Sequence, residues 1–325
     1  MPQLSYGFAI GRVQVLSKSL LSGAAIGRLL SLDTVEDVAR ALTELNWGDV
    51  RGARDIEQAA EHHVQAAAAL VRDTSPDAAA TDCFLVRYDA LNLKLLVKAR
   101  ALGQLDGLPL SPNGLIDAQR LRRAVEERRY AELPEEFLDA MERIEGRIAV
   151  KMDPLFVDAE LDKAAQRFIN RRIEDTDDAV IRAYFAERTC MLNLLIALRS
   201  HAIGRDGAFA REMLLPGGTL DEDALAQVAD APERAAALIS GKPYAGALAA
   251  TLKRTPVDLA EVEKAVDDRL AGLLSGHKNE TLTIRPLVGY LLAREREAGA
   301  VRLIATAKAA NVPITTIERR LRAMY

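Results

Sequence analysis

The chain of 325 residues carries a net charge of −4 at pH 7, with 49% apolar and 28% charged residues, which is typical of a folded globular protein. Aromatic residues make up only 5%, so the composition favours helices over strands. The small net charge argues against nucleic acid as the default partner, and two cysteines are too few for a disulfide framework, which fits a reducing cytoplasm.

The start of the chain does not have the features of a signal peptide. Its first eight residues lack the charged start and the apolar stretch that such peptides carry. The most apolar run further along, Met191 to Ile203, is interrupted by Asn193, Arg199 and His201. It falls short of the roughly 20 apolar residues that span a bilayer, so we expect no membrane span.

Helical periodicity appears along almost the whole sequence. Residues 33–36 (Asp-Thr-Val-Glu) and 230–233 (Asp-Ala-Pro-Glu) have the form of a capping box, which predicts helix starts. Segments 55–72 and 259–274 each carry a single apolar stripe at helical spacing. Clear strand alternation is absent, and the fold class predicted is all-α.

An internal repeat is the most informative feature of the sequence. The acidic and apolar pattern of residues 55–60 recurs at 160–165 and at 261–266, with offsets of 105 and 101 residues. A period of this length exceeds the roughly 20–50 residues of solenoid repeats and matches a small domain. We therefore expect three related helical modules.

Further matches recur in step with the first. Asp89–Leu93 corresponds to Cys190–Leu194 at offset 101 and, more loosely, to Glu297–Val301. Each of these segments leads to a base, and Arg100, His201 and Lys308 take matching places. Two shorter segments match in pairs, 113–117 with 217–221 and 32–36 with 229–233.

Breaker residues suggest where the modules meet. The breaks at 108–114 and 215–218 fall at equivalent places in the repeat. They predict three helical repeat domains, 1–107, 108–214 and 215–325. Because no low-complexity linker separates them, we expect a stiff assembly.

Motifs for catalysis or metal binding are mostly missing. The sequence has no phosphate loop, dinucleotide fingerprint or paired Cys-x-x-Cys, and the adjacent His62 and His63 point to different sides of a helix. The acidic cluster at residues 174–178 (Glu-Asp-Thr-Asp-Asp) is compatible with a prenyl-diphosphate enzyme whose carboxylates hold magnesium. Capping of the next helix explains the cluster better. We expect no catalytic residue, no metal and no cofactor.

The C-terminal segment is basic. Residues 285–325 contain eight Lys or Arg and three Glu, whereas the rest of the chain is acidic. A basic module can face an acidic partner, and an ordinary solvated helix face explains the pattern equally well.

The order and spacing of six segments carry a resemblance to a known family. These segments are Tyr6 to Val13, Leu29–Asp49 with its Trp47-Gly48 end, Asp89–Lys94, Leu214–Gly218, Arg294–Ala298 and Val301–Ile304. Through them the chain resembles, over nearly its whole length, the C subunit of the prokaryotic V/A-type rotary ATPases, the family that includes the d subunit of V-ATPases. Two residues depart from the family pattern: Cys190 stands where an acid is common, and Ala300 stands where an Asn would complete the third copy.

The resemblance implies an all-α, pseudo-threefold funnel of three domains and a non-catalytic rotor role. Such a protein sits on the cytoplasmic face of the membrane as a peripheral part of the complex. It receives the central shaft of the D and F subunits, rests on the proteolipid ring (c/K/L), has the a/I subunit as a further candidate neighbour, and transmits torque between ATP turnover and ion transport. Arg294, Arg296 and Arg302 are the predicted partner-interface residues. The alternatives are the prenyl-diphosphate enzyme and an unrelated helical scaffold.

Overall fold

The computed structural model describes residues 5–324, and within them every regular element is a helix. Part of the N-terminal segment considered above, Met1–Leu4, and the last residue of the basic segment, Tyr325, lie outside the described residues. The predicted all-α class is confirmed. No helix between residues 5 and 324 is both long and apolar enough to cross a membrane.

The described residues form two compact units. Unit 1 combines both ends of the chain, Met1–Pro76 and Ala260–Tyr325, and unit 2 is Asp77–Leu259. The predicted domains end instead at residues 107 and 214, and this three-domain division stays a prediction, as does the funnel arrangement.

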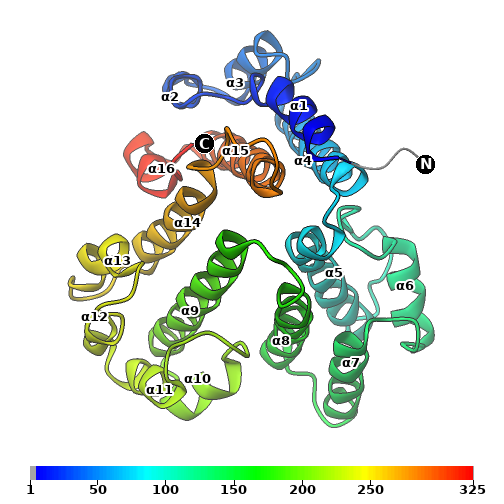
Figure 1. Ribbon diagram of the computed structural model, residues 1–325, viewed down its shortest axis with the longest axis vertical. Helices are drawn as coiled ribbons and strands as arrows, with labels where there is room; N and C mark the ends of the chain where they lie inside the picture. Colours follow the sequence, from blue (N-terminus) through cyan, green and yellow to red (C-terminus); the bar gives the residue numbers. More distant parts are fainter. Residues whose placement is uncertain (1–4, 325) are drawn as a thin grey trace. The chain divides into compact units, whose positions relative to one another are not determined.

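Unit 1 is built around a pair of long helices. Its helices are α1 (Tyr6–Ser17), α2 (Gly23–Ser31), α3 (Val35–Glu44), α4 (Ala53–Thr74), α14 (Leu259–Ser275), α15 (Arg285–Ala309) and α16 (Ile314–Arg320). Helix α4 lies alongside α15, and α1, α2 and α3 also contact α15 (Figure 1). The apolar stripe predicted for 55–72 is the buried face of α4, with Ile56, Val64 and Val71 at its centre.

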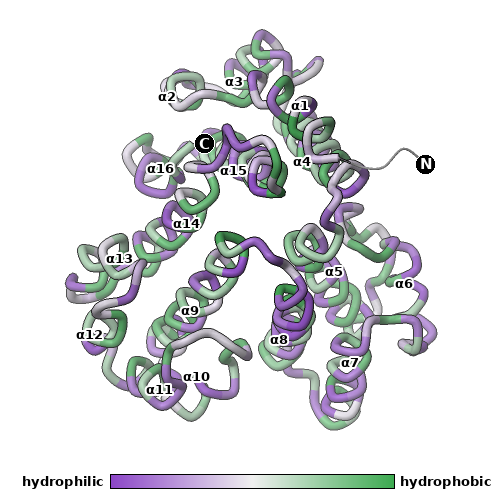
Figure 2. Tube along the Cα trace, viewed as in Figure 1, coloured by the Kyte–Doolittle hydropathy of each residue, from purple (hydrophilic) through white to green (hydrophobic). Residues whose placement is uncertain are grey.

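Unit 2 contains a second such pair. Its helices are α5 (Ala78–Ala101), α6 (Ala118–Glu127), α7 (Glu135–Ile148), α8 (Pro154–Ile173), α9 (Ala179–Ala202), α10 (Gly207–Met213), α11 (Glu222–Asp230), the 3₁₀ turn η1 (Pro232–Arg234), α12 (Ala235–Leu238) and α13 (Ala245–Leu252). Helix α5 packs on α8, α7 packs on α8, and α10 and α11 pack on α9. Figure 2 shows apolar and polar residues alternating along these helices, as expected where one face is buried.

Equivalent residues of the repeat meet inside unit 2. The rings of Phe84 on α5 and Phe185 on α9 lie 4.8 Å apart, and the two positions differ by the repeat offset of 101. Tyr184 packs on both rings. Tilted aromatic pairs at this distance add to the stability that burial provides, so the repeated sequence positions are also packing positions.

Within residues 5–324, eight helices begin at a short polar side chain that accepts a backbone N–H. These N-cap residues are Ser22, Thr34, Asp77, Asp117, Asp153, Asp178, Asp206 and Asp221. The capping box predicted at 33–36 is displaced by one residue, because Thr34 rather than Asp33 accepts the N–H of Asp37. Asp230 does not cap the turn that follows it but accepts the N–H of Gly207.

Candidate partner interface and the anchors that support it

The first repeat anchor fastens a loop onto helix α5. The buried carboxylate of Asp89 accepts the backbone N–H groups of Leu115 and Ile116 at 2.8 and 3.0 Å. One turn further along, Asn92 donates to the carbonyl of Ser111 and accepts its N–H, each at 2.8 Å. Burial raises the pKa of Asp89 to about 6, and the two N–H donors oppose this shift.

The second anchor repeats this geometry on helix α9. Asn193 donates to the carbonyl of Leu215 at 3.0 Å and accepts its N–H at 2.8 Å. At the place of Asp89, the thiol of Cys190 accepts the N–H of Thr219 at 3.1 Å. Sulfur is a weak acceptor, and it takes one N–H here where the carboxylate takes two. The break at 215–218 is therefore a loop fastened to α9.

The third anchor uses the opposite end of the chain. Glu297 on α15 accepts the backbone N–H of Leu21, in the loop before α2. Both the carboxylate and the bond are buried. Ser22 then caps α2, as Asp117 caps α6 and Asp221 caps α11. The loop that completes the third copy therefore lies near residue 21, before its anchor helix α15 in the sequence. In the other two copies the loop follows the anchor helix, so aligning the three repeats in chain order does not reveal it.

The ends of the three anchor helices are also alike. Gly103, Gly204 and Asn311 take positive φ, and the N–H of the next residue bonds back to the carbonyls of Ala99, Ser200 and Ala307 at 2.9, 2.8 and 2.8 Å. This is the same helix-end motif in all three copies. The residue before the turn is exposed at Leu102 (72%) and at Ile203 (58%).

The bases noted at the helix ends have comparable partners in two copies. Arg100 donates to the carbonyl of Val125 at 2.8 Å. His201 places Nδ1 2.8 Å from the carbonyl of Ala229. A carbonyl only accepts, so Nδ1 carries the proton. Val125 and Ala229 lie near the ends of α6 and α11, so each base ties a short helix to its long neighbour.

Arg294 is buried inside unit 1. Its guanidinium pairs with Glu297 at 2.7 Å and donates to the hydroxyl of Tyr290 at 3.1 Å. It also donates to the carbonyls of Leu16 and Ser19 and to the Ser19 hydroxyl. The side chain is only 4% exposed. Arg294 therefore holds the α1–α2 loop against α15.

The other two predicted interface residues are more accessible. Arg296 pairs with Asp268 at 2.9 Å and donates to the carbonyls of Asp267 and Ala323. Arg302 pairs with Glu57 at 2.8 Å and Glu61 at 3.0 Å, and its side chain is 30% exposed. The structure does not bring the three arginines into one cluster by mutual contact. Their place at a partner interface stays a prediction.

His63 occupies the same region of unit 1, with its ring 4.7 Å from that of Trp47. Burial, followed by the charges of Arg294 and His62, lowers the pKa of His63 to about 4. The unfolded chain takes up this proton near pH 6.5, so the free energy of unfolding falls as the pH drops from 6.5 to 4.

We expect His63→Gln to remove about 1–2 kcal/mol of this pH dependence, a value reduced because the ring is partly exposed. Urea unfolding of the wild type and the variant at pH 5 and pH 7 measures it, and other titrating groups cancel in the comparison. His62→Gln, on the exposed neighbour, is the control. Equal pH dependence in wild type and His63→Gln would contradict the prediction.

The acidic segment 174–178 has a structural role at the start of α9. Asp178 accepts the N–H groups of Val180 and Ile181 at 3.0 and 3.1 Å, which confirms the capping interpretation. Among residues 5–324, no group of three or more His, Cys, Asp or Glu side chains is placed to hold a metal ion.

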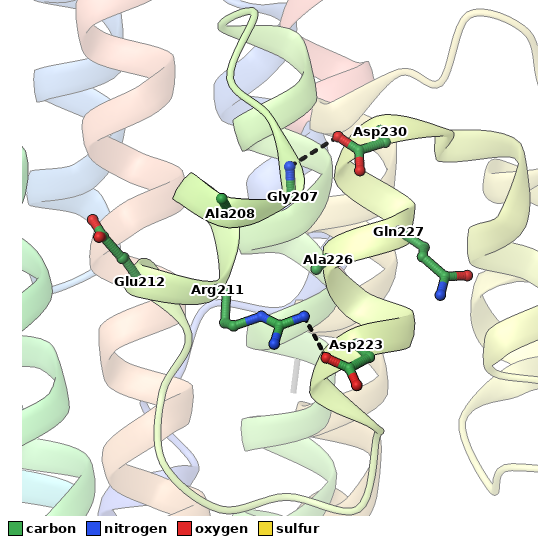
Figure 3. Close-up of a pocket in the computed structure, with 8 residues that line it drawn as sticks. All are labelled: Gly207, Ala208, Arg211, Glu212, Asp223, Ala226, Gln227 and Asp230. Atoms are coloured by element: carbon green, nitrogen blue, oxygen red, sulfur yellow. Dashed lines mark hydrogen bonds and ion pairs between the residues drawn. The ribbon is translucent and has the colours of Figure 1, made fainter.

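An open hollow of about 750 Å³ lies between α10 and α11, and Figure 3 shows the residues that line it. An ion pair between Arg211 and Asp223 crosses it, and the Gly207–Asp230 bond closes one end. A Cβ at Gly207 would lie 2.6 Å from the Ala226 carbonyl, so the glycine allows the two helices to approach. Arg211 and Asp223 pair with each other and Asp230 holds the backbone of Gly207, which suits a packing site better than a ligand site.

Together these features define an all-helical protein made of internal repeats, each anchored by a polar side chain on a long helix. The family model of the ATP synthase (C/AC39) subunit matches residues 9–320. The chain belongs to this family.

Curated relatives agree with this assignment. The C subunit of the V-type sodium ATPase of Enterococcus hirae is 22% identical over 262 residues, which is 78% of each chain. The C subunits of the A-type ATP synthases of Desulfurococcus sp. and Thermococcus kodakarensis are 29% and 26% identical over 133 residues. Those two matches cover 41% of this chain and 36% of each relative.

Proposed function

We propose that this chain is the non-catalytic rotor adaptor of a V/A-type ATPase. In this proposal it is a socket that links the central shaft, made of the D and F subunits, to the proteolipid ring at the cytoplasmic face of the membrane. It transmits the torque that couples ATP hydrolysis or synthesis to ion transport. Family membership over residues 9–320 is the observation that carries the proposal.

The anchors support a mechanical role. A part that transmits torque must resist twisting, and close-packed interiors have low compressibility. Asp89, Asn193 and Glu297 each fix a loop to a long helix through buried hydrogen bonds. Buried polar groups of this kind are costly to leave unpaired, so the loops stay attached. The three-domain, pseudo-threefold funnel is part of the proposal.

Affinity purification of the tagged full chain from detergent-solubilised membranes of its own cells tests the proposal. We expect the D and F subunits and the proteolipid to co-purify with it, with the a/I subunit as a further candidate. A chain that purifies without any of these proteins would contradict the rotor role and favour an independent scaffold.

Arg302→Glu tests the predicted basic interface within the same experiment. We expect this charge reversal to reduce the yield of complex severalfold, because like charges across an interface repel. Arg28→Glu is the matched control, since Arg28 is also a surface arginine of unit 1 paired with a glutamate, Glu44, at 2.6 Å. Equal yields from the two variants would remove Arg302 from the interface.

A further inference from the structure

Helix α1 has an apolar outer face that nothing in the described chain covers. Its inner face packs on α4 and α15 through Ala9, Ile10 and Val13, all buried. On the outer face Phe8 is 61% exposed and Val15 is 65% exposed, and Leu16 beside them is 38% exposed. Residues 8 and 15 are seven apart, so they lie on the same side of the helix.

A shallow groove lies along this outer face of α1 and is open to solvent; Figure 1 shows the helix itself. The groove measures about 540 Å³ and is lined by Gly7, Phe8, Gly11, Arg12, Val15 and Leu16, all residues of α1. Gly7 and Gly11 are one turn apart, and a Cβ at either would meet no atom within 4 Å. Small residues at this spacing let the backbone of a second helix come close. From residue 7 to residue 16 the groove is roughly 14 Å long at 1.5 Å per residue, or about two and a half turns of such a helix.

The charge of the face is one-sided. Between residues 5 and 32 the sequence has three bases and no acid. Arg28 pairs with Glu44, whereas Arg12 and Lys18 form no ion pair within residues 5–324. Arg12 lies over the Phe8 ring, 5.8 Å from its centre, in the middle of the apolar strip. Burying the Arg12 charge in the hydrocarbon of a bilayer would be costly, whereas a carboxylate of a partner protein would pair with it. The charge therefore favours a protein with a carboxylate as the occupant.

We propose that the outer face of α1 binds a helix of another subunit of the rotary ATPase. The partner helix lies along the Gly7–Gly11 groove, packs apolar side chains between Phe8 and Val15, and places a carboxylate opposite Arg12. This inference rests on the proposed function for the identity of the complex. It adds a docking surface in unit 1 whose lining residues do not include Arg302 or its partners Glu57 and Glu61.

Filling the groove tests the proposal. We expect Gly11→Leu to lower the amount of complex recovered with the tagged chain by about tenfold, the size of effect seen for well-packed interface positions. Gly27→Leu is the control, because Gly27 is also an exposed helical glycine of unit 1 with no atom near its Cβ position. Both changes raise helix propensity, so unfolding would not explain a loss. Arg12→Glu should act like Gly11→Leu, and Arg12→Lys should retain most of the complex.

A photo-crosslinking amino acid at Val15 identifies the occupant. In the assembled complex we expect a crosslink to a helical peptide of an ATPase subunit with an Asp or Glu within one turn of the attachment point. Crosslinks to lipid, to a second copy of this chain, or to no other protein of the complex would overturn the proposal. So would flotation of the purified chain with phosphatidylglycerol vesicles that depends on Phe8 and Arg12.

The outcomes separate the two proposals. If the wild-type chain recovers its partner proteins but Gly11→Leu and Gly27→Leu behave alike, the α1 surface is wrong and the rotor role stands. If the wild type recovers no protein of the ATPase, the rotor role fails first, and the absence of a crosslink from Val15 to any such protein overturns the α1 proposal with it.

Discussion

Replacing Arg294 with alanine is expected to destabilise unit 1 by about 3–5 kcal/mol, the usual cost of removing one member of a buried ion pair. The change leaves the Glu297 carboxylate, which is 0% exposed, without its cation. It also removes the donors that reach the carbonyls of Leu16 and Ser19. Because Glu297 accepts the N–H of Leu21, the α1–α2 loop should loosen from α15.

Urea unfolding gives the free energy, and amide exchange at Leu21 reports the loop itself. Arg302→Ala is the control, since its partly exposed pairs with Glu57 and Glu61 are worth only about 0.2–1 kcal/mol each. The double variant Arg294→Met with Glu297→Leu should be less destabilised than Arg294→Ala, because no charge is left buried. Equal stability of Arg294→Ala and Arg302→Ala would show that the buried pair does not hold the loop.

Gly114→Ala is expected to destabilise unit 2 by about 2–3 kcal/mol through overpacking and lost hydrogen bonds. A Cβ at this position would lie 2.2 Å from Oδ1 of Asp89 and 3.3 Å from its backbone nitrogen. The carboxylate must move away, and it then no longer accepts both Leu115 and Ile116. The Asp89 side chain is buried, so it finds no water in exchange.

Gly146→Ala supplies a control with the opposite expected sign. Gly146 is an exposed residue of α7 with nothing within 4 Å of its Cβ position, so alanine should stabilise the helix by up to about 1 kcal/mol. Urea unfolding curves of the two variants and the wild type measure both changes in the free energy of unfolding. A neutral Gly114→Ala would mean that the loop shifts without loss and that the Asp89 anchor is not rigid.

The equivalent glycine of the second copy is under a weaker constraint from its anchor. A Cβ at Gly218 would lie 3.3 Å from the thiol of Cys190. Gly218 also has a φ of +90°, which disfavours other residues whatever the space around them. The thiol is shorter than a carboxylate, so it leaves more room. Cys190, at the place that Asp89 takes in the first copy, therefore constrains the loop less without removing the anchor, because Asn193 still holds Leu215 from both sides.

The helices could be predicted from the sequence because their signals are local. The stripe at 55–72 lies within α4, and the stripe at 259–274 coincides with α14 to within one residue. Capping was harder to predict, since neighbouring polar residues compete for the same N–H. Asp33 and Thr34 both suit an N-cap, and only the backbone conformation at Thr34 decides between them.

The candidate site was harder to predict because it depends on contacts distant in sequence. Arg294, Arg296 and Arg302 look alike as part of a basic segment, yet their surroundings differ. Arg294 is buried against Ser19, which is 275 residues away, and Arg302 reaches Glu57, 245 residues away. The outer face of α1 was missed for the same reason, since which side of a short apolar helix is buried depends on its packing partners.

By itself, the sequence determined the all-helical class and the positions of the repeated anchors, because helix propensity, capping and periodicity act over a few residues. It also carried the family resemblance. Only the tertiary structure showed what the anchors do and that Leu21 near the start of the chain completes the third copy on α15. A hydrogen bond between a side chain and a distant loop leaves no periodic signal, so the folded chain alone could reveal it.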